Sequence, residues 1–188
     1  MRVSIKFSSL PKSMLKNTEP EGEKLDFQQF VRIVKRDLFK GVFIPHDMTL
    51  WLSLIGEKDI EELMAHHALL MDIQRCSESF TLWYDLFLDL ARSKKDEICR
   101  NLNKYKGWQN KINCGEGNGF LVETLLEGSY DDTIEDLLRL LRNSRQHSSR
   151  YRHALYASIV GQNFPNLISD FQKELYKAGC LKELGVLK

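Results

Sequence analysis

The sequence predicts an all-α fold, a single compact helical domain of about seven to nine helices. Apolar residues recur at spacings of three and four in one segment after another, which is the period of an amphipathic helix. No segment alternates between apolar and polar residues for the length of a strand. A chain of 188 residues is long enough to bury one sizeable core. Helices packed around one core are therefore expected.

The composition narrows the function classes without choosing one. The formal net charge of +1 excludes a global basic field that would hold nucleic acid, so any such binding must use local charge. No apolar stretch approaches the roughly 20 residues that span a bilayer. The cysteines are scattered, without a CxxC pair or a secretory signal before them. We expect a cytoplasmic protein, with a nuclear one not excluded, that has no membrane partner and no cofactor.

The first part of the chain contains an irregular segment and two helices. Residues 1–21 predict a flexible or extended lead-in, and 22–188 the helical domain. Apolar spacing predicts a helix over 23–40 that stops at Gly41. A short helix is expected over 50–55, capped by Asp47 or Thr49 and ending at Gly56.

Four helices are expected in the middle of the chain. They cover 59–74, a strongly apolar segment that ends at Leu90, the more polar 94–105, and 120–126. Ser77 or Ser79 is the predicted cap of the apolar segment.

Three helices are expected toward the C-terminus. The first covers 132–146, with Asp132 as its cap and Glu135 three residues later, as in a capping box. Its buried stripe is expected to comprise Ile134, Leu137, Leu138 and Leu141. The second covers 151–160. The third is capped by Asn163, has Pro165 in its first turn and ends at Gly179.

Two suggestive patterns do not predict sites. The glycines of 115–119 do not have GxGxxG spacing and follow no strand, so they indicate a connection between helices rather than a nucleotide loop. His66 and His67 are adjacent and would project about 100° apart on a helix, which is unsuitable for a shared metal ion. No metal site is predicted.

The most informative run is 130–147. Asn143 and His147 lie four residues apart and would share a helix face, Arg142 neighbours that face, and Tyr130 can fold back against it. A cluster of this kind could handle one phosphate group. The alternative is that Arg142 is a surface ion-pair partner, Asn143 and His147 end the helix, and Tyr130 only packs.

The same run resembles the signature helix of a known nuclease family. Asp-Leu-Leu-Arg-Leu-Leu-Arg-Asn-x-x-x-His, at 136–147, is similar to that of the KEN nuclease domain. This domain is found in ribonuclease L and in the kinase–endoribonuclease of the unfolded-protein response. Trp108 with Ile112, the spacing from Tyr130 to Arg142, and Phe-Pro-Asn-Leu at 164–167 follow in family order. The core of the resemblance spans 108–176.

The resemblance implies metal-independent cleavage of single-stranded or loop RNA through a 2′,3′-cyclic phosphate, by a dimer. His147 would protonate the leaving oxygen, and Tyr130 would orient or deprotonate the 2′-OH. Arg142 would stabilise phosphorane charge, and Asn143 would position the phosphate or the nucleophile. The basic side chains expected to contact the RNA backbone are Arg139, Arg145 and Arg150.

Two other hypotheses remain open. The family's kinase lobe has no counterpart in the sequence, since its glycine loop and its His-Arg-Asp and Asp-Phe-Gly motifs do not occur. The chain could then be a catalytically silent KEN-like module that binds RNA or pairs with a related kinase/nuclease as a heterodimer. It could also be a helical adaptor of unrelated ancestry, in which the motif arose by chance.

Overall fold

The fold is all-α, as predicted, in a computed structural model that describes residues 20–56, 67–71, 73–114, 118–147 and 160–181. The described part contains eight α-helices, a further helical turn at 160–163, and no strand. None of these helices is long and apolar enough to cross a membrane. In chain order the elements are α1 (Pro20–Ile33), η2 (Val34–Leu38), α2 (His46–Leu54), η3 (Ala68–Leu70), α4 (Ile73–Asp89), α5 (Arg92–Asn101), η4 (Asn103–Tyr105), α6 (Trp108–Cys114), α7 (Gly119–Glu127), α8 (Ile134–His147) and α10 (Leu167–Lys177).

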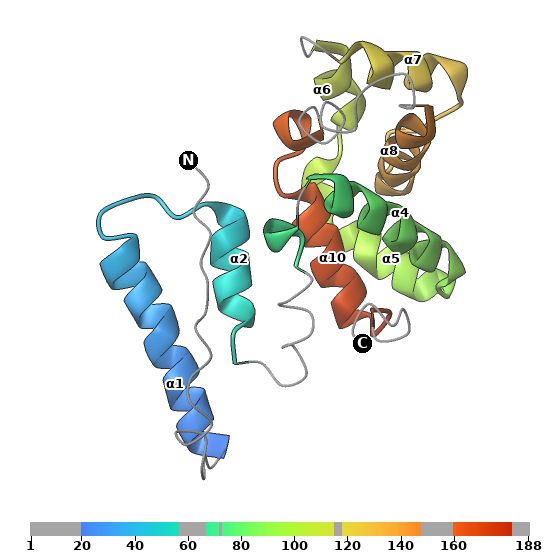
Figure 1. Cartoon of the computed structure of the whole chain (residues 1–188). Coiled ribbons are helices and arrows are strands. Elements are labelled where there is room, and N and C mark those ends of the chain that lie inside the picture. The colour runs from blue at the N-terminus through green and yellow to red at the C-terminus, as the bar shows by residue number, and fades with distance from the viewer. Residues whose placement is uncertain (1–19, 57–66, 72, 115–117, 148–159, 182–188) are drawn as a thin grey trace.

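Helices α4 to α10 pack around one main core. Phe171 of α10 is fully buried, and its ring centroid lies 5.8 Å from those of both Phe80 and Phe87 of α4. Helix α8 packs between α4 and α7, and α10 contacts α4, α5 and η3 (Figure 1). Aromatic pairs at this spacing add to the stability that burial provides.

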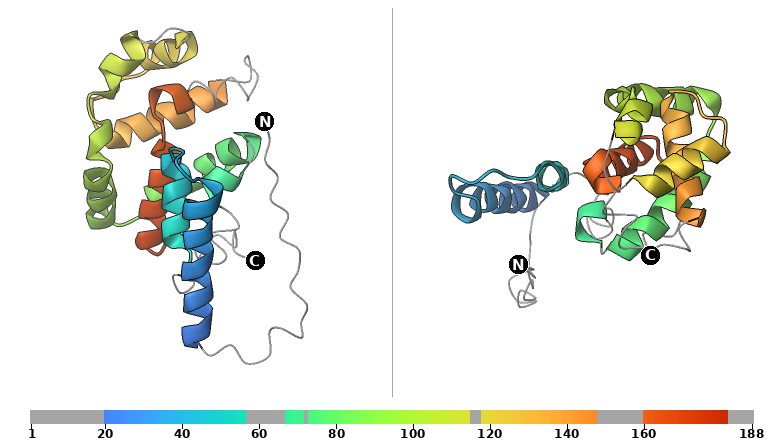
Figure 2. Two further views of the ribbon diagram at one scale, coloured as in Figure 1. Left: turned by 90° about the vertical axis from the view of Figure 1, so that its left-hand side faces the viewer. Right: turned by 90° about the horizontal axis from the view of Figure 1, so that it is seen from above.

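Helices α1 and α2 lie side by side at one edge of the molecule, with α1 outermost (Figure 2). A smaller apolar cluster around Val34, Trp51 and Leu52 holds them together. The continuous helix of α1 and η2 agrees with the prediction for 23–40, but it begins at Pro20, inside the predicted lead-in. Proline suits a first helical position because its missing N–H has no partner there. Residues 1–19 lie outside the described part.

Polar contacts attach α10 to its neighbours. The Gln172 side-chain oxygen accepts a hydrogen bond from the backbone N–H of Ala68 at 2.8 Å, and Asn101 donates to Glu174 at 2.6 Å. The Tyr105 hydroxyl donates to Asp170 at 2.5 Å. These bonds fix α10 against η3, α5 and η4.

Several predicted helix starts are wrong because tertiary packing overrides local capping tendencies. Helix α2 begins at His46 after Pro45 and has no side-chain cap, so neither Asp47 nor Thr49 serves as one. Helix α4 begins at Ile73 and runs through Ser77 and Ser79. Ser77 is 1% exposed, so it lies within the packed face of the helix instead of at its end.

The predicted helix over 59–74 is interrupted. Residues 68–70 form a 3-10 turn and Met71 is extended, with ψ 146°; residues 57–66 and 72 lie outside the described part. The predicted helix over 94–105 is divided between α5 and η4, and α6 was not predicted. Most of the predicted 151–160 helix also lies outside the described residues.

Asn163 is not the cap of the last helix. Helix α10 begins at Leu167, after Asn166 in the left-handed region with φ 73°. The Asn163 side chain instead exchanges hydrogen bonds of 2.9 and 2.7 Å with Asn118. Two amides bind each other in this arrangement, and Asn163 lies four residues before α10 begins.

Truncating the buried face of α8 should destabilise the fold. Leu137 is fully buried, so we expect Leu137→Ala to lower the free energy of unfolding by about 2–5 kcal/mol, measured by urea denaturation. The control Leu126→Ala removes the same atoms from a side chain that is 80% exposed and should change it by less than about 0.5 kcal/mol. Equal effects of the two substitutions would contradict this packing.

Stability should fall in acid through His67. Burial lowers the pKa of His67 from its ordinary 6.5 to about 4, and its Nδ1 accepts from the Leu69 N–H at 3.1 Å. As the pH falls, His67 therefore takes up a proton in the unfolded chain at a higher pH than in the folded chain. His67 contributes its full stability above pH 6.5 and loses it as the pH falls from about 6.5 to 4, by about 3 kcal/mol.

Urea unfolding from pH 7 to pH 4 measures this loss against His67→Asn. Asparagine can accept the same backbone hydrogen bond without titrating in this range. We expect the wild type to lose more stability than the variant over this interval. An identical pH dependence would show that His67 is not the titrating group.

Candidate functional site

The buried face of α8 determines where its polar edge lies. The predicted stripe of Ile134, Leu137, Leu138 and Leu141 is confirmed, since all four are at most 5% exposed. Leu140 is also fully buried, so the apolar face is wider than predicted. Most of the polar side chains of α8 therefore lie on the opposite edge of the helix, although Ser144 is fully buried.

The start of α8 differs from the prediction. Thr133 is the cap: its Oγ1 accepts from the Asp136 N–H at 3.1 Å, and its carbonyl accepts the first helical bond from Leu137 at 3.0 Å. The prediction that Asp132 is the cap was wrong. Its two carboxylate oxygens accept from the N–H of Gly107, at 3.1 and 3.0 Å. The carboxylate fixes the turn before α6 instead.

Helix α6 also holds the segment that carries Tyr130. Trp108 is fully buried and its indole N–H donates to the Thr133 carbonyl at 2.9 Å. The Gln109 side chain donates to the Tyr130 carbonyl at 2.7 Å. Two bonds from consecutive residues of α6 therefore fix the backbone on which Tyr130 sits.

Three of the four predicted catalytic residues form one hydrogen-bonded array. The Asn143 side-chain N–H donates to the Tyr130 hydroxyl oxygen at 3.0 Å. Arg142 Nη1 lies 3.3 Å from Asn143 Oδ1 and donates to Gln146 Oε1 at 2.7 Å. Tyr130 is half-buried, so its hydroxyl is held at the edge of the core.

Arg139 orients the Tyr130 ring. Its guanidinium carbon lies 4.5 Å from the ring centroid, its Nη2 lies 3.0 Å from Asp136 Oδ1, and it also donates to the Ser129 carbonyl. The other neighbour of the ring is Gly128, where an added Cβ would clash with the Tyr130 ring. The cation and the glycine together restrict the ring to one position.

The other predicted residues are placed differently. Helix α8 continues to His147, so its backbone lies one turn beyond Asn143, while its side chain is outside the described part. Arg145, predicted to contact RNA, donates to the Thr81 hydroxyl of α4. Arg150 lies outside the described residues.

Sequence reasoning missed two contributors. Gln146 holds Arg142, and its position four residues later on the helix is a signal that could have identified it. Gln109 holds the Tyr130 backbone across 21 residues, and no local pattern indicates such a contact.

The electrostatics near α8 do not favour nucleophilic catalysis by cysteine. Burial raises the pKa of Tyr84; Arg139 and Arg142 offset part of this rise, while Glu135 and Asp136 add to it, so charges of both signs act on this tyrosine. Burial also raises the pKa of Cys99, on α5, to about 11, so it is a thiol at neutral pH. Within the described ranges, no group of three or more His, Cys, Asp and Glu side chains has the arrangement of a metal site.

No known protein family, curated protein or solved structure matches this chain in sequence or fold comparisons.

Filling the space at Gly128 should displace the tyrosine. We expect Gly128→Ala to push the Tyr130 ring away and break its hydrogen bond with Asn143, because the added carbon would overlap the ring. Chemical shifts of the Asn143 side-chain amide would report the loss. Gly119→Ala is the matched control, since a Cβ there meets no atom within 4 Å. An unchanged Asn143 amide in Gly128→Ala would contradict this geometry.

Proposed function

We propose that the chain is a metal-independent endoribonuclease that cleaves single-stranded or loop RNA by attack of the 2′-OH. The observation that carries the proposal is the array in which Asn143 binds Tyr130 and Arg142 lies beside Asn143. The order of motifs, which resembles that of the KEN nuclease domain, supports the same function. In this reaction the 2′-oxygen attacks phosphorus, the bond from phosphorus to the 5′-oxygen breaks, and a 2′,3′-cyclic phosphate forms.

Tyr130 would handle the proton of the 2′-OH. Its hydroxyl oxygen already accepts a hydrogen bond from Asn143, which holds the phenol in place. The phenol would orient the 2′-OH or accept its proton as the 2′-oxygen attacks phosphorus. The amide thus positions the phenol before the substrate arrives.

Arg142 would stabilise the phosphorane. A guanidinium has five donors in a planar fork, and the contacts of Arg142 with Asn143 and Gln146 both use Nη1. The Nη2 donors remain for a phosphate oxygen. Gln146 and Asn143 hold the fork in place before substrate arrives, so little ordering is required in the transition state.

His147 would protonate the leaving 5′-oxygen, as the resemblance implies. Its backbone position one turn after Asn143 puts it on the same edge of α8. Imidazole titrates near neutral pH, which suits a general acid. A homodimer, or a heterodimer with a related kinase/nuclease, would complete the assembly.

A silent RNA-binding module is the second candidate. It is favoured by the hydrogen bonds of Asn143 with Tyr130 and Arg142, because these occupy both ends of the Asn143 amide without a substrate. This function predicts RNA binding without cleavage.

A cleavage assay with labelled RNA in EDTA, over a series of protein concentrations, tests the proposal. The wild type should yield 2′,3′-cyclic phosphate ends, with specific activity rising with concentration if a dimer is required. Tyr130→Phe, Arg142→Lys and His147→Ala should each lower the rate by about 100-fold or more. Substrate with a 2′-deoxy group at the scissile nucleotide should resist cleavage.

Two surface substitutions are the controls for this assay. Arg92→Lys and His46→Ala change exposed side chains of other helices and should retain the wild-type rate. If the wild type binds RNA but does not cut it, the silent module replaces the nuclease as the function. If the wild type neither binds nor cuts RNA, the adaptor hypothesis is the one that remains.

A further inference from the structure

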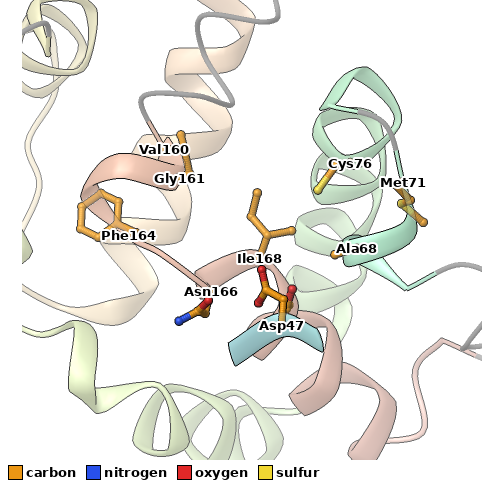
Figure 3. A pocket seen from close by; sticks show the side chains of 10 residues that line it. Asp47, Ala68, Met71, Cys76, Val160, Gly161, Phe164, Asn166 and Ile168 are labelled. Carbon is orange, nitrogen blue, oxygen red and sulfur yellow. The ribbon is translucent and has the colours of Figure 1, made fainter. Parts of the chain in front are cut away.

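A second candidate site lies away from α8. A cavity of about 180 Å³ opens where α2, η3, α4, residues 160–164 and the start of α10 meet (Figure 3). Its walls are mainly apolar, with Met71, Phe164 and Ile168 among them, and no residue of α8 lines it. The cavity is therefore separate from the array around Tyr130.

One carboxylate in this cavity has an unmet hydrogen-bonding requirement. Asp47, in the first turn of α2, extends toward Ile168 in Figure 3. Its Oδ1 is buried and has no hydrogen-bond partner. An ionised carboxylate only accepts hydrogen bonds, and burying an acceptor without a donor is costly. The missing partner must be a donor, and a cationic donor would also balance the charge.

Basic side chains at this end of α2 contact another acid, Asp170. Lys104 Nζ lies 2.6 Å from Asp170 Oδ2, and His46 Nε2 lies 3.5 Å from Asp170 Oδ1. Tyr105 donates to the same Asp170 carboxylate at 2.5 Å. Asp170 is thus well supplied with donors, while Asp47 on the cavity side is not.

We propose that this cavity binds a small primary alkylammonium group. A dry apolar cavity of about 150 Å³ accommodates benzene, so this space suits a ligand of about six non-hydrogen atoms. The ammonium would donate to the Asp47 carboxylate, and the alkyl body would pack against Met71, Phe164 and Ile168. Ser169, which is 3% exposed and lines the cavity, supplies a further polar group. The group could belong to a free amine or to a lysine side chain.

Titration calorimetry with full-length protein tests the proposal. 3-Methylbutylamine should bind, whereas 3-methyl-1-butanol, which has the same number of heavy atoms without the charge, should bind at least about tenfold more weakly. Nα-acetyl-lysine N-methylamide is the second arm: tighter binding of this probe than of the free amine identifies a lysine side chain as the natural occupant. No heat with either amine at millimolar concentration would overturn the proposal.

Two variants locate the site. Asp47→Asn should weaken amine binding by at least about tenfold, while Asp37→Asn, at an exposed acid outside the cavity, should not. Gly161→Leu should block the cavity without harming the fold, since Gly161 lines the space and a Cβ there meets nothing within 4 Å. Thermal unfolding verifies that each variant is folded. Unchanged amine affinity in both Asp47→Asn and Gly161→Leu would contradict the assignment.

Discussion

Burial of the apolar face of α8 is the constraint on which the candidate active site depends. Leu137, Leu138, Leu140 and Leu141 are all fully buried, so the helix cannot rotate without exposing several leucines at once. Each such side chain contributes about 1.5–3 kcal/mol when it is removed from water. The rotation of α8 about its axis is thus fixed by packing against α4 and α7. This packing alone determines the direction in which the polar edge of α8 faces.

Polar contacts then fix the position of Tyr130 beside the polar edge of α8. Helix α6 holds the segment before α8 through Trp108 and Gln109, which brings Tyr130 to Asn143. The Arg139 guanidinium also contacts the ring, and Gly128, which has no Cβ, leaves room for it. A reacting group must be held within a fraction of an ångström, and a tyrosine on an untethered loop would not meet this requirement.

Helix α10 has a comparable role for the second site. Its aromatic contacts with α4 and its hydrogen bonds with η3 and α5 are made by side chains on several of its faces. The left-handed turn at Asn166 precedes it and lines the cavity with Ile168 and Ser169. The two candidate sites therefore belong to different helices of the same core and can be altered separately by mutation.

The sequence was informative where structure follows from local periodicity. The stripe on α8 and the helix stops at Gly56 and Gly179 follow from spacing and from glycine at positive φ. The first helix ends at Leu38, three residues before the predicted stop at Gly41. The sequence was misleading where a polar side chain has a distant partner. Asp132 binds Gly107 and Asn163 binds Asn118, so neither caps a helix.

In the candidate site, too, the sequence predicts what local periodicity sets and does not predict contacts between distant residues. Asn143 was identified because helical spacing places it on one face with His147, and Arg142 because it neighbours that face. The stacking of Arg139 on Tyr130, in contrast, depends on how the preceding segment folds back. The cavity at Asp47 could not be predicted at all. Its walls come from segments as far apart as residues 47 and 169, which no local pattern connects.

The central claim is that Tyr130 and Asn143 act as one unit on one phosphate. A double-mutant cycle on RNA cleavage in EDTA, with Tyr130→Phe, Asn143→Ala and the double variant, tests it most directly. Residues that act as a unit are non-additive, so the double variant should lose little more activity than the more damaged single variant. Effects that multiply, or wild-type protein that does not cleave RNA, would contradict the account.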